Sequence, residues 1–241
     1  MADGIALIPL TGIDEIEFGA DLAQVLADAL APAKAGGPDL RQGDVIVITQ
    51  KVVSKAEGRI VPIDTDDPAA KTALVEQESV RILRRRGDLI ISETRHGFIC
   101  ANAGIDLSNV DLGTAALLPV DSDRSARRVR ARLRVLFGVD VGVIISDTFG
   151  RTWRRGVTDV AIGCAGVAAV IDLRGTLDAN GRELIATEVC VADELASAAE
   201  LVMGKDSGIP AAIVRGVPDD WLRPASVHTE IVRPPEEDLF R

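Results

Sequence analysis

The sequence predicts a mixed α+β protein in which short strands are flanked by helices. Two long polar segments have helical character, and many short apolar runs have the length and β-branched content of strands. The predicted strands and helices do not alternate strictly, so a regular βαβ architecture is not expected. With 241 residues, 47% of them hydrophobic, the chain is long enough to bury a sizeable core.

The first half of the chain predicts short strands with two helices between them. Pro9 and Gly12 end the first strand, and the Ala/Leu-rich segment that follows has helical spacing. The run DVIVIT has the character of a buried strand, and Thr94–Gly97 suits the turn of a hairpin. In order, these elements are a strand at 5–10, a helix at 21–31, a strand at 44–49, a helix with a charged face at 68–86, and hairpin strands at 89–92 and 97–101.

The second half follows a turn-rich segment at 121–125, which separates two halves of similar size. This segment is the candidate boundary between two lobes of a single domain spanning 1–241. The sequence DANG at 178–181 is typical of a tight turn. In order, the predicted elements are a basic amphipathic helix at 125–137, a strand at 141–145, a Gly/Ala-rich segment at 160–171, a strand at 183–189, a helix at 193–203 and a strand at 211–215.

The composition disfavours several classes of function. A net charge of −10 argues against a general nucleic-acid surface, and an aromatic content of 3% argues against base-stacking platforms. Because Cys100, Cys164 and Cys190 form no CxxC pair, they are expected to be buried thiols of a cytoplasmic protein. No apolar run reaches the ~18 residues of a membrane span, and acidic residues interrupt any signal-like stretch.

The most informative segment is VGVIISDTFGRTWRR at 141–155, where an apolar strand is predicted to end at Ser146. Asp147 and Thr148 follow, with an arginine cluster that begins at Arg151 and includes Arg154 and Arg155. A hard cation prefers carboxylate oxygen, and phosphate oxygens prefer arginine and backbone N–H groups. The segment therefore fits a metal–polyphosphate site. A turn with solvated arginines fits it equally well.

Two further loops carry polar side chains after predicted strands. Asp106 and Asn109 lie in NAGIDLSN, so Asp106 and Asp147 form a candidate pair of metal ligands, or each Asp caps a turn. Gln50 and Lys55 lie in QKVVSKAEGR, which resembles a phosphate-handling loop in composition. It lacks the Walker A pattern, and the chain contains neither GxGxxG nor GxSxG.

Taken together, the motifs resemble the coenzyme F420-0:γ-glutamyl ligase family, F420 being a deazaflavin cofactor. The resemblance runs in unbroken order from about Ile8 to the end of the chain. It does not include the C-terminal nitroreductase-like domain that some members carry. The matching segments are QKVVSKAEGR at 50–59, NAGIDLSN at 102–109, SDTFGRTWRRG at 146–156, AIGCAG at 161–166, GREL at 181–184, VADELASAAELVMGK at 191–205 and IPAAIVRG at 209–216.

The resemblance implies a GTP-dependent ligase that adds L-glutamate to coenzyme F420-0 in a two-lobed fold with mainly antiparallel sheets, assembled as a homodimer. It implies Mg²⁺ or Mn²⁺, with K⁺ a further candidate, held by Asp106, Asp147 and Thr148. Asp106, Asp147 and Arg151 are the implied catalytic residues. The implied GTP contacts are Ile13, Asp14, Glu15, Ile16, Gln50, Lys55, Asn109, Met203, Gly204, Lys205 and Gly208.

The sequence departs from the family pattern at two positions. Lys205 stands where archaeal members have a glutamate ligand for a second metal, and Gln50 stands where some members have serine. Lys205 is therefore expected to contact phosphate rather than metal. Two alternative functions stay open from the residues alone, namely a non-catalytic nucleotide- or metal-binding regulator and a metal-dependent phosphohydrolase.

Overall fold

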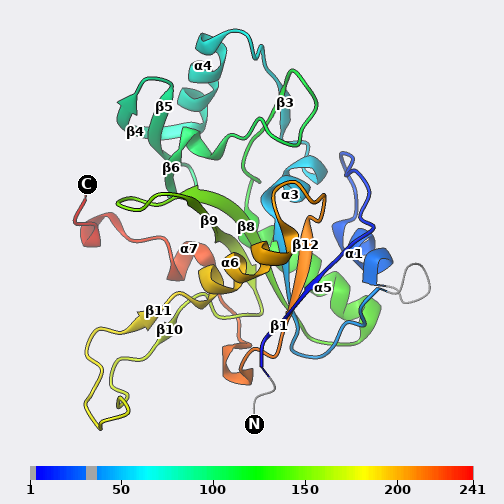
Figure 1. Ribbon diagram of the computed structural model, residues 1–241, viewed down its shortest axis with the longest axis vertical. Coiled ribbons are helices and arrows are strands. Elements are labelled where there is room, and N and C mark those ends of the chain that lie inside the picture. Colours follow the sequence, from blue (N-terminus) through cyan, green and yellow to red (C-terminus); the bar gives the residue numbers. More distant parts are fainter. Residues whose placement is uncertain (1–3, 31–36, 241) are drawn as a thin grey trace.

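The computed structural model describes residues 4–30 and 37–240 (Figure 1). Its centre is a five-stranded sheet with the order β1-β12-β2-β8-β9. The strands are β1 (Ala6–Pro9), β12 (Ala211–Arg215), β2 (Val45–Thr49), β8 (Gly142–Gly150) and β9 (Val157–Ala165). All neighbours are antiparallel except β2 and β8, which run parallel. The predicted mixed α+β class is confirmed.

Helices cover both faces of this sheet, which explains why β2 is apolar at successive positions. Ile46 and Ile48 pack in one cluster with α1 (Leu22–Leu30), α3 (Gln50–Ala56) and α5 (Ser122–Phe137). Val45 and Val47 pack in the other cluster, with α6 (Val191–Met203) and α7 (Val227–Glu230). Each of these four side chains is at most 1% exposed. The large lobe is thus a sheet between two helical layers.

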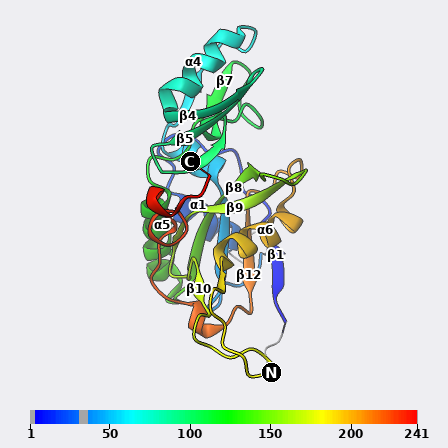
Figure 2. The ribbon, with the colours of Figure 1, turned by 90° about the vertical axis from the view of Figure 1, so that its left-hand side faces the viewer.

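A smaller lobe is inserted between α3 and α5 and lies at one end of the large sheet (Figures 1 and 2). Its own apolar cluster includes Val75, Ile90 and Ala115. Its elements are β3 (Ile60–Pro62), α4 (Pro68–Glu78), β4 (Ser79–Arg86), β5 (Leu89–Thr94), β6 (Ile99–Ala101), the 3₁₀ turn η1 (Asn102–Gly104) and β7 (Thr114–Ala116). Residues 121–125, the candidate boundary, are the N-cap and first turn of α5. Because β1 and β2 pair with strands that follow residue 121, this position marks the return from the insertion rather than a midpoint between halves.

The remaining elements are short. β10 (Ile171–Asp172) pairs with β11 (Glu188–Val189) at the base of a projecting arm. Two 3₁₀ turns, η2 (Asp219–Trp221) and η3 (Pro235–Glu237), lie in the C-terminal segment. Within the described ranges, no helix is both long and apolar enough to cross a membrane.

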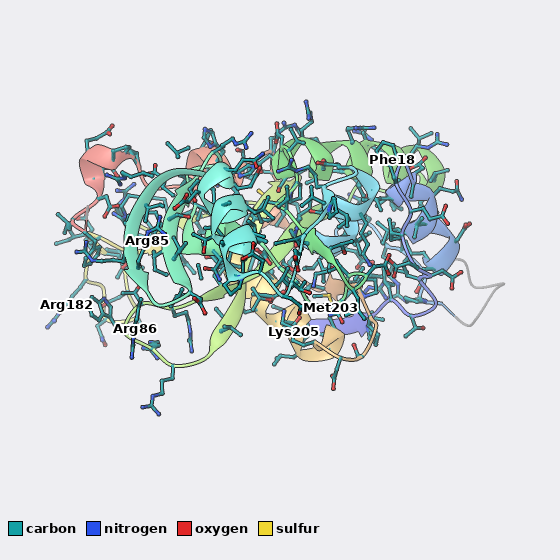
Figure 3. The ribbon with its side chains drawn as sticks, turned by 90° about the horizontal axis from the view of Figure 1, so that it is seen from above. Phe18, Arg85, Arg86, Arg182, Met203 and Lys205 are labelled. Atoms are coloured by element: carbon teal, nitrogen blue, oxygen red, sulfur yellow. The ribbon has the colours of Figure 1, made fainter. Side chains whose placement is uncertain are left out.

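The predicted helix at 68–86 is wrong beyond Glu78. At Ser79 the backbone becomes extended, and β4 pairs with β5 instead. Ile82 packs against the small-lobe core. Strand pairing and burial therefore outweigh the local preference of this charged segment for a helix. Arg85 and Arg86 are exposed on this strand, well away from Lys205 (Figure 3).

The strand predicted to end at Ser146 in fact continues to Gly150. β9, which the sequence presented only as a Gly/Ala-rich segment, supplies hydrogen-bonding partners along its whole length. Asp147 and Thr148 therefore lie within a strand rather than in a strand-end loop. The predicted strand at 183–189 is reduced to Glu188–Val189, and Cys190 is partly rather than fully buried.

Candidate functional site

A cavity of about 930 Å³ opens where the two lobes meet, beside the end of β2 and along β8. Its walls come from the 13–16 loop, the start of α3, the 106–111 loop, β8, β9 and the loop after α6. Most of the predicted site residues line it, namely Ile13, Asp14, Glu15, Ile16, Gln50, Lys55, Asp106, Asn109, Asp147, Thr148, Gly204, Lys205 and Gly208. The fold thus brings together segments that lie far apart in sequence.

Two predicted site residues do not line this cavity. Met203, the last residue of α6, is fully buried and packs in the core. Arg151 is exposed in the turn between β8 and β9 and donates a hydrogen bond to the Arg155 carbonyl oxygen at 2.9 Å. Arg154 is also exposed in that turn. The arginine cluster accordingly lies outside the cavity of the single chain.

Gln50 and Ser54 fix the start of α3 against the small lobe. The Gln50 amide donates hydrogen bonds to Ser54 Oγ at 2.7 Å and to the Leu117 carbonyl oxygen at 2.9 Å. Ser54 Oγ donates to the same carbonyl oxygen at 2.6 Å. Both amide hydrogens of Gln50 are therefore used within the protein, and any contact with a ligand falls to its side-chain oxygen.

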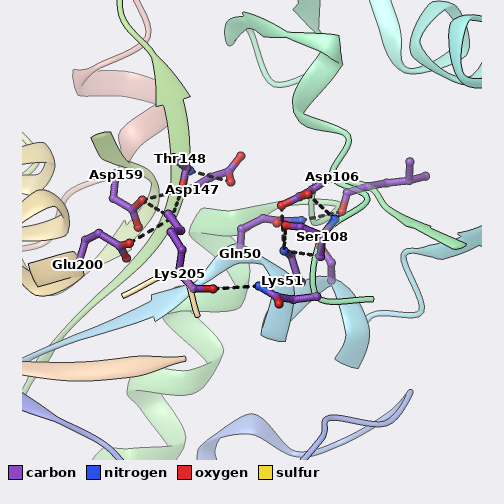
Figure 4. A network of polar contacts seen from close by, with 12 residues as sticks. Gln50, Lys51, Asp106, Ser108, Asp147, Thr148, Asp159, Glu200 and Lys205 are labelled. Carbon is purple, nitrogen blue, oxygen red and sulfur yellow. Dashed lines mark hydrogen bonds and ion pairs between the residues drawn. The ribbon is translucent and has the colours of Figure 1, made fainter. Parts of the chain in front are cut away.

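On one side of the cavity, Asp106 is paired with Lys51. Lys51 Nζ lies 2.8 Å from Asp106 Oδ2 and 2.6 Å from the Ser108 carbonyl oxygen, while the Ser108 N–H donates to Asp106 Oδ1 (Figure 4). Burial acts to raise the pKa of Asp106, but the hydrogen bonds from Lys51 and Ser108 outweigh it and lower the pKa below its ordinary value. Asp106 is thus ionised and held in position.

On the other side, Lys205 is surrounded by oxygen atoms. Its ammonium group lies 2.9 Å from Asp159 Oδ1 and 3.4 Å from Glu200 Oε1, and it donates a hydrogen bond to Thr148 Oγ1. Asp159 is only 2% exposed and also accepts hydrogen bonds from Ser146 and Thr148. Burial and the charge of Asp159 raise the pKa of Glu200. Lys205 is therefore the cation that compensates two carboxylates.

Asp147 lies between these two groups without a lysine or arginine of its own in the described part of the chain (Figure 4). Burial raises its pKa to about 7, and the charges of Asp106 and Asp159 add to this effect, against a hydrogen bond from the Thr148 N–H and the charge of Lys205. A carboxylate without an ion-pair partner beside a second carboxylate is a favourable setting for a divalent cation.

The donor set fits one hard cation. Asp106, Asp147 and Thr148 offer only oxygen atoms, which Mg²⁺ and Mn²⁺ prefer. Within residues 4–30 and 37–240, no cluster of three or more His, Cys, Asp or Glu side chains is arranged to hold a metal. A bound ion would thus take its other ligands from water or from phosphate oxygens, as Mg²⁺ commonly does.

Other contacts close the cavity. Asn109 Nδ2 donates to the Lys205 carbonyl oxygen at 3.3 Å and so links the small-lobe loop to the loop after α6. Lys55 forms an ion pair with Glu15 of the N-terminal loop. A second cavity of about 450 Å³ adjoins the first at Glu15 and Lys55, and the exposed Phe18 borders it (Figure 3).

Sequence reasoning missed Asp159, Glu200 and Lys51. Asp159 faces Thr148 across the β8–β9 ladder, but β9 was not recognised as a strand, so its facing residues could not be assigned. Glu200 lies on a predicted helix, but it is five residues before Lys205, which follows the end of that helix, so the three- and four-residue spacings of a helix gave no signal for this pair.

Comparison with known proteins agrees with this arrangement. Residues 12–216 match the model of the family F420-0:Gamma-glutamyl ligase. The chain is 46% identical over 253 residues to the coenzyme F420:L-glutamate ligase of Methanothermobacter thermautotrophicus, covering 99% of each chain. It is 46% identical over 245 residues to that of Methanopyrus kandleri, covering 94% of each, and 41% identical over 217 residues to that of Methanocaldococcus jannaschii, covering 84% of this chain and 86% of the relative. The chain therefore belongs to the F420-0:γ-glutamyl ligase family.

Proposed function

We propose that this chain is a GTP-dependent ligase that joins L-glutamate to coenzyme F420-0 by an amide bond, and that it can extend the product with further glutamates. The observation that carries the proposal is the position of the family's residues. Asp106, Asp147 and Thr148 meet in one cavity with Lys51, Lys55 and Lys205, although they come from segments far apart in sequence. Relatives that match nearly the whole chain are named as ligases of coenzyme F420 and L-glutamate.

The chemistry requires activation of a carboxylate. In the first step, a carboxylate oxygen of F420-0 bonds to the γ-phosphorus of GTP, the bond to the β-phosphate oxygen breaks, and GDP leaves. In the second, the glutamate amine attacks the acyl carbon, loses a proton and expels phosphate. Each step concentrates negative charge, so it depends on fixed cationic groups near the phosphates.

The cavity offers such groups. Asp106, Asp147 and Thr148 would hold Mg²⁺ or Mn²⁺, which supplies charge neutralisation at phosphate oxygens when bound. Lys51 and Lys55 project from α3 into the same space, and the loop after α6 brings backbone close to it at Gly204 and Gly208. About 930 Å³ is within the usual size of a small-molecule site, and the adjoining second cavity leaves room for a second substrate.

The decisive experiment incubates purified protein with GTP, L-glutamate, F420-0 and Mg²⁺ and follows GDP release and product mass. Amide product formed together with GDP supports the ligase. GDP release without F420-0 or glutamate indicates a phosphohydrolase, and nucleotide binding without turnover indicates a regulator. The preference for GTP rests on the family alone. Equal kcat/KM values for ATP and GTP would therefore contradict the nucleotide preference and leave the ligase proposal intact.

The proposal includes a homodimer. Large apolar side chains are exposed on three separate elements, with Trp153 87%, Ile185 85% and Leu201 81% exposed in the single chain. Contact between two chains would remove such side chains from water, which is favourable. Light scattering coupled to size-exclusion chromatography at micromolar concentration should give the mass of two chains, and the mass of one chain would contradict this part.

A further inference from the structure

The Lys205 ammonium makes two hydrogen bonds and a further ion pair with protein oxygens. An ammonium group has three N–H donors and no acceptor. Three protein oxygens lie around it, from Asp159 at 2.9 Å, Glu200 at 3.4 Å and Thr148. A phosphate would therefore compete with protein oxygens, two of them carboxylate oxygens, for this ammonium.

The three oxygens form a cage that is built around positive charge. Ser146 and Thr148 orient Asp159 by hydrogen bonds of 3.0 and 2.7 Å. The second oxygen of Glu200 is buried and has no hydrogen-bond partner. Without Lys205, the cage would consist of two carboxylates and a hydroxyl, with no other described lysine or arginine in ion-pair contact with either carboxylate.

The cage shares Thr148 with the predicted divalent-cation site. Thr148 follows Asp147 directly on β8, and its hydroxyl accepts the Lys205 hydrogen bond while donating to Asp159. Two cation positions therefore lie side by side, one predicted at Asp147 and one filled by a side chain (Figure 4).

We infer that the Lys205 ammonium is a tethered cation that occupies a second metal position formed by Asp159, Glu200 and Thr148. The chain then binds one divalent ion where its oxygen ligands would otherwise accommodate two. This inference deepens the proposed function, and it depends on that function only for the divalent-cation site at Asp147. Lys205 is a positioning residue, which holds Asp159 and Thr148 in place beside that position and cannot be removed by a chelator.

Counting bound Mn²⁺ tests this inference without any substrate. Free Mn²⁺ is measured by electron paramagnetic resonance during titration of the purified protein with Mn²⁺ alone. The wild type should bind one ion per chain, and Lys205→Ala should bind two, because removal of the ammonium frees a set of hard oxygen ligands. Lys205→Arg, which keeps the charge, should bind one. Lys205→Ala combined with Asp159→Asn should return to one, because the cage loses a carboxylate.

Lys71→Ala is the matched control, since Lys71 lies on α4 and forms none of these contacts. Circular dichroism establishes that each variant is folded, and Lys205→Gln replaces Lys205→Ala if the latter is not. Two ions bound to the wild type, or equal counts in the wild type and a folded Lys205 neutral variant, would overturn the inference. A negative ligase assay would overturn the proposed function instead and leave the ion counts unaffected.

Discussion

At the scale of single residues, Asp106, Asp147 and Asp159 of the cavity differ in how their charge is compensated. Asp106 is paired with Lys51 and Asp159 with Lys205, whereas Asp147 has no such partner among the described residues. Burial consequently raises the pKa of Asp147 to about 7, while that of Asp106 is lowered. A carboxylate that lacks compensation in the free protein is available to a cation that arrives with a substrate.

This difference predicts opposite effects of Asp147→Asn on function and stability. Ligation should be abolished, because a hard cation loses an anionic ligand. The melting temperature of the metal-free protein should be unchanged or higher, because a partly buried charge without a partner is removed. Turnover assays at saturating Mg²⁺ and thermal unfolding in a chelator measure the two effects.

Asp106→Asn is the matched comparison for that prediction. It should also abolish ligation, but it should lower stability by about 1 kcal/mol, because it breaks the ion pair with Lys51. Near-normal turnover in either variant would remove the assignment of these carboxylates to a metal.

At the scale of elements, the large lobe depends on a close approach between α5 and β9. A Cβ atom at Gly163 of β9 would lie 2.4 Å from the Ser122 carbonyl carbon at the start of α5. The same helix start is fixed by Asp123, which accepts hydrogen bonds from the Cys164 and Val227 N–H groups. Since β9 also carries Asp159, this packing positions one wall of the cavity.

Gly163→Ala is therefore expected to destabilise the protein by about 1–3 kcal/mol, the usual cost of overpacking. Gly150→Ala is the control, because Gly150 has an ordinary φ and no atom within 4 Å of its Cβ position. Urea unfolding of both variants gives the comparison. Equal midpoints would show that α5 can move away from β9 without cost.

At the scale of the whole molecule, an ion pair within the C-terminal segment binds Val170, which follows β9 of the large lobe, through hydrogen bonds. Arg223 lies 2.7 Å from Glu230, and the Val170 N–H donates to the same carboxylate. Burial acts to raise the pKa of Glu230, but these hydrogen bonds outweigh it and lower the pKa below its ordinary value. The ionised form is thus favoured in the folded state.

Glu230→Gln should accordingly reduce the free energy of unfolding by about 1 kcal/mol at neutral pH. Because the folded pKa is depressed, this contribution is complete above the ordinary pKa of about 4.3 and is lost as the pH falls through the lower folded value. Urea unfolding at pH 7 and in the acid range measures it. If the difference in the free energy of unfolding between wild type and variant persisted in acid, it would not come from the ionised Glu230 carboxylate.

The sequence predicted the large features because local signals and tertiary structure agree there. In DVIVIT and in the helix at 193–203, the apolar positions of the sequence pattern are the ones that the fold buries. The prediction of a helix over 79–86 was wrong because this charged strand has no apolar periodicity and because its pairing with β5 is not a local signal. Asp159 was missed for the same reason, since its role depends on the partner that β9 finds.

The cavity contains more acidic than basic side chains, and this excess of negative charge affects how fast an anionic nucleotide can enter it. Lys51, Lys55 and Lys205 are each already engaged by carboxylates, and Asp14, Asp111 and Asp206 add further negative charge at the walls. A free nucleoside triphosphate would be repelled on approach, whereas its magnesium complex carries much less charge. If GTP is the substrate, association rates should therefore follow the concentration of the magnesium complex and rise with ionic strength for any uncomplexed nucleotide.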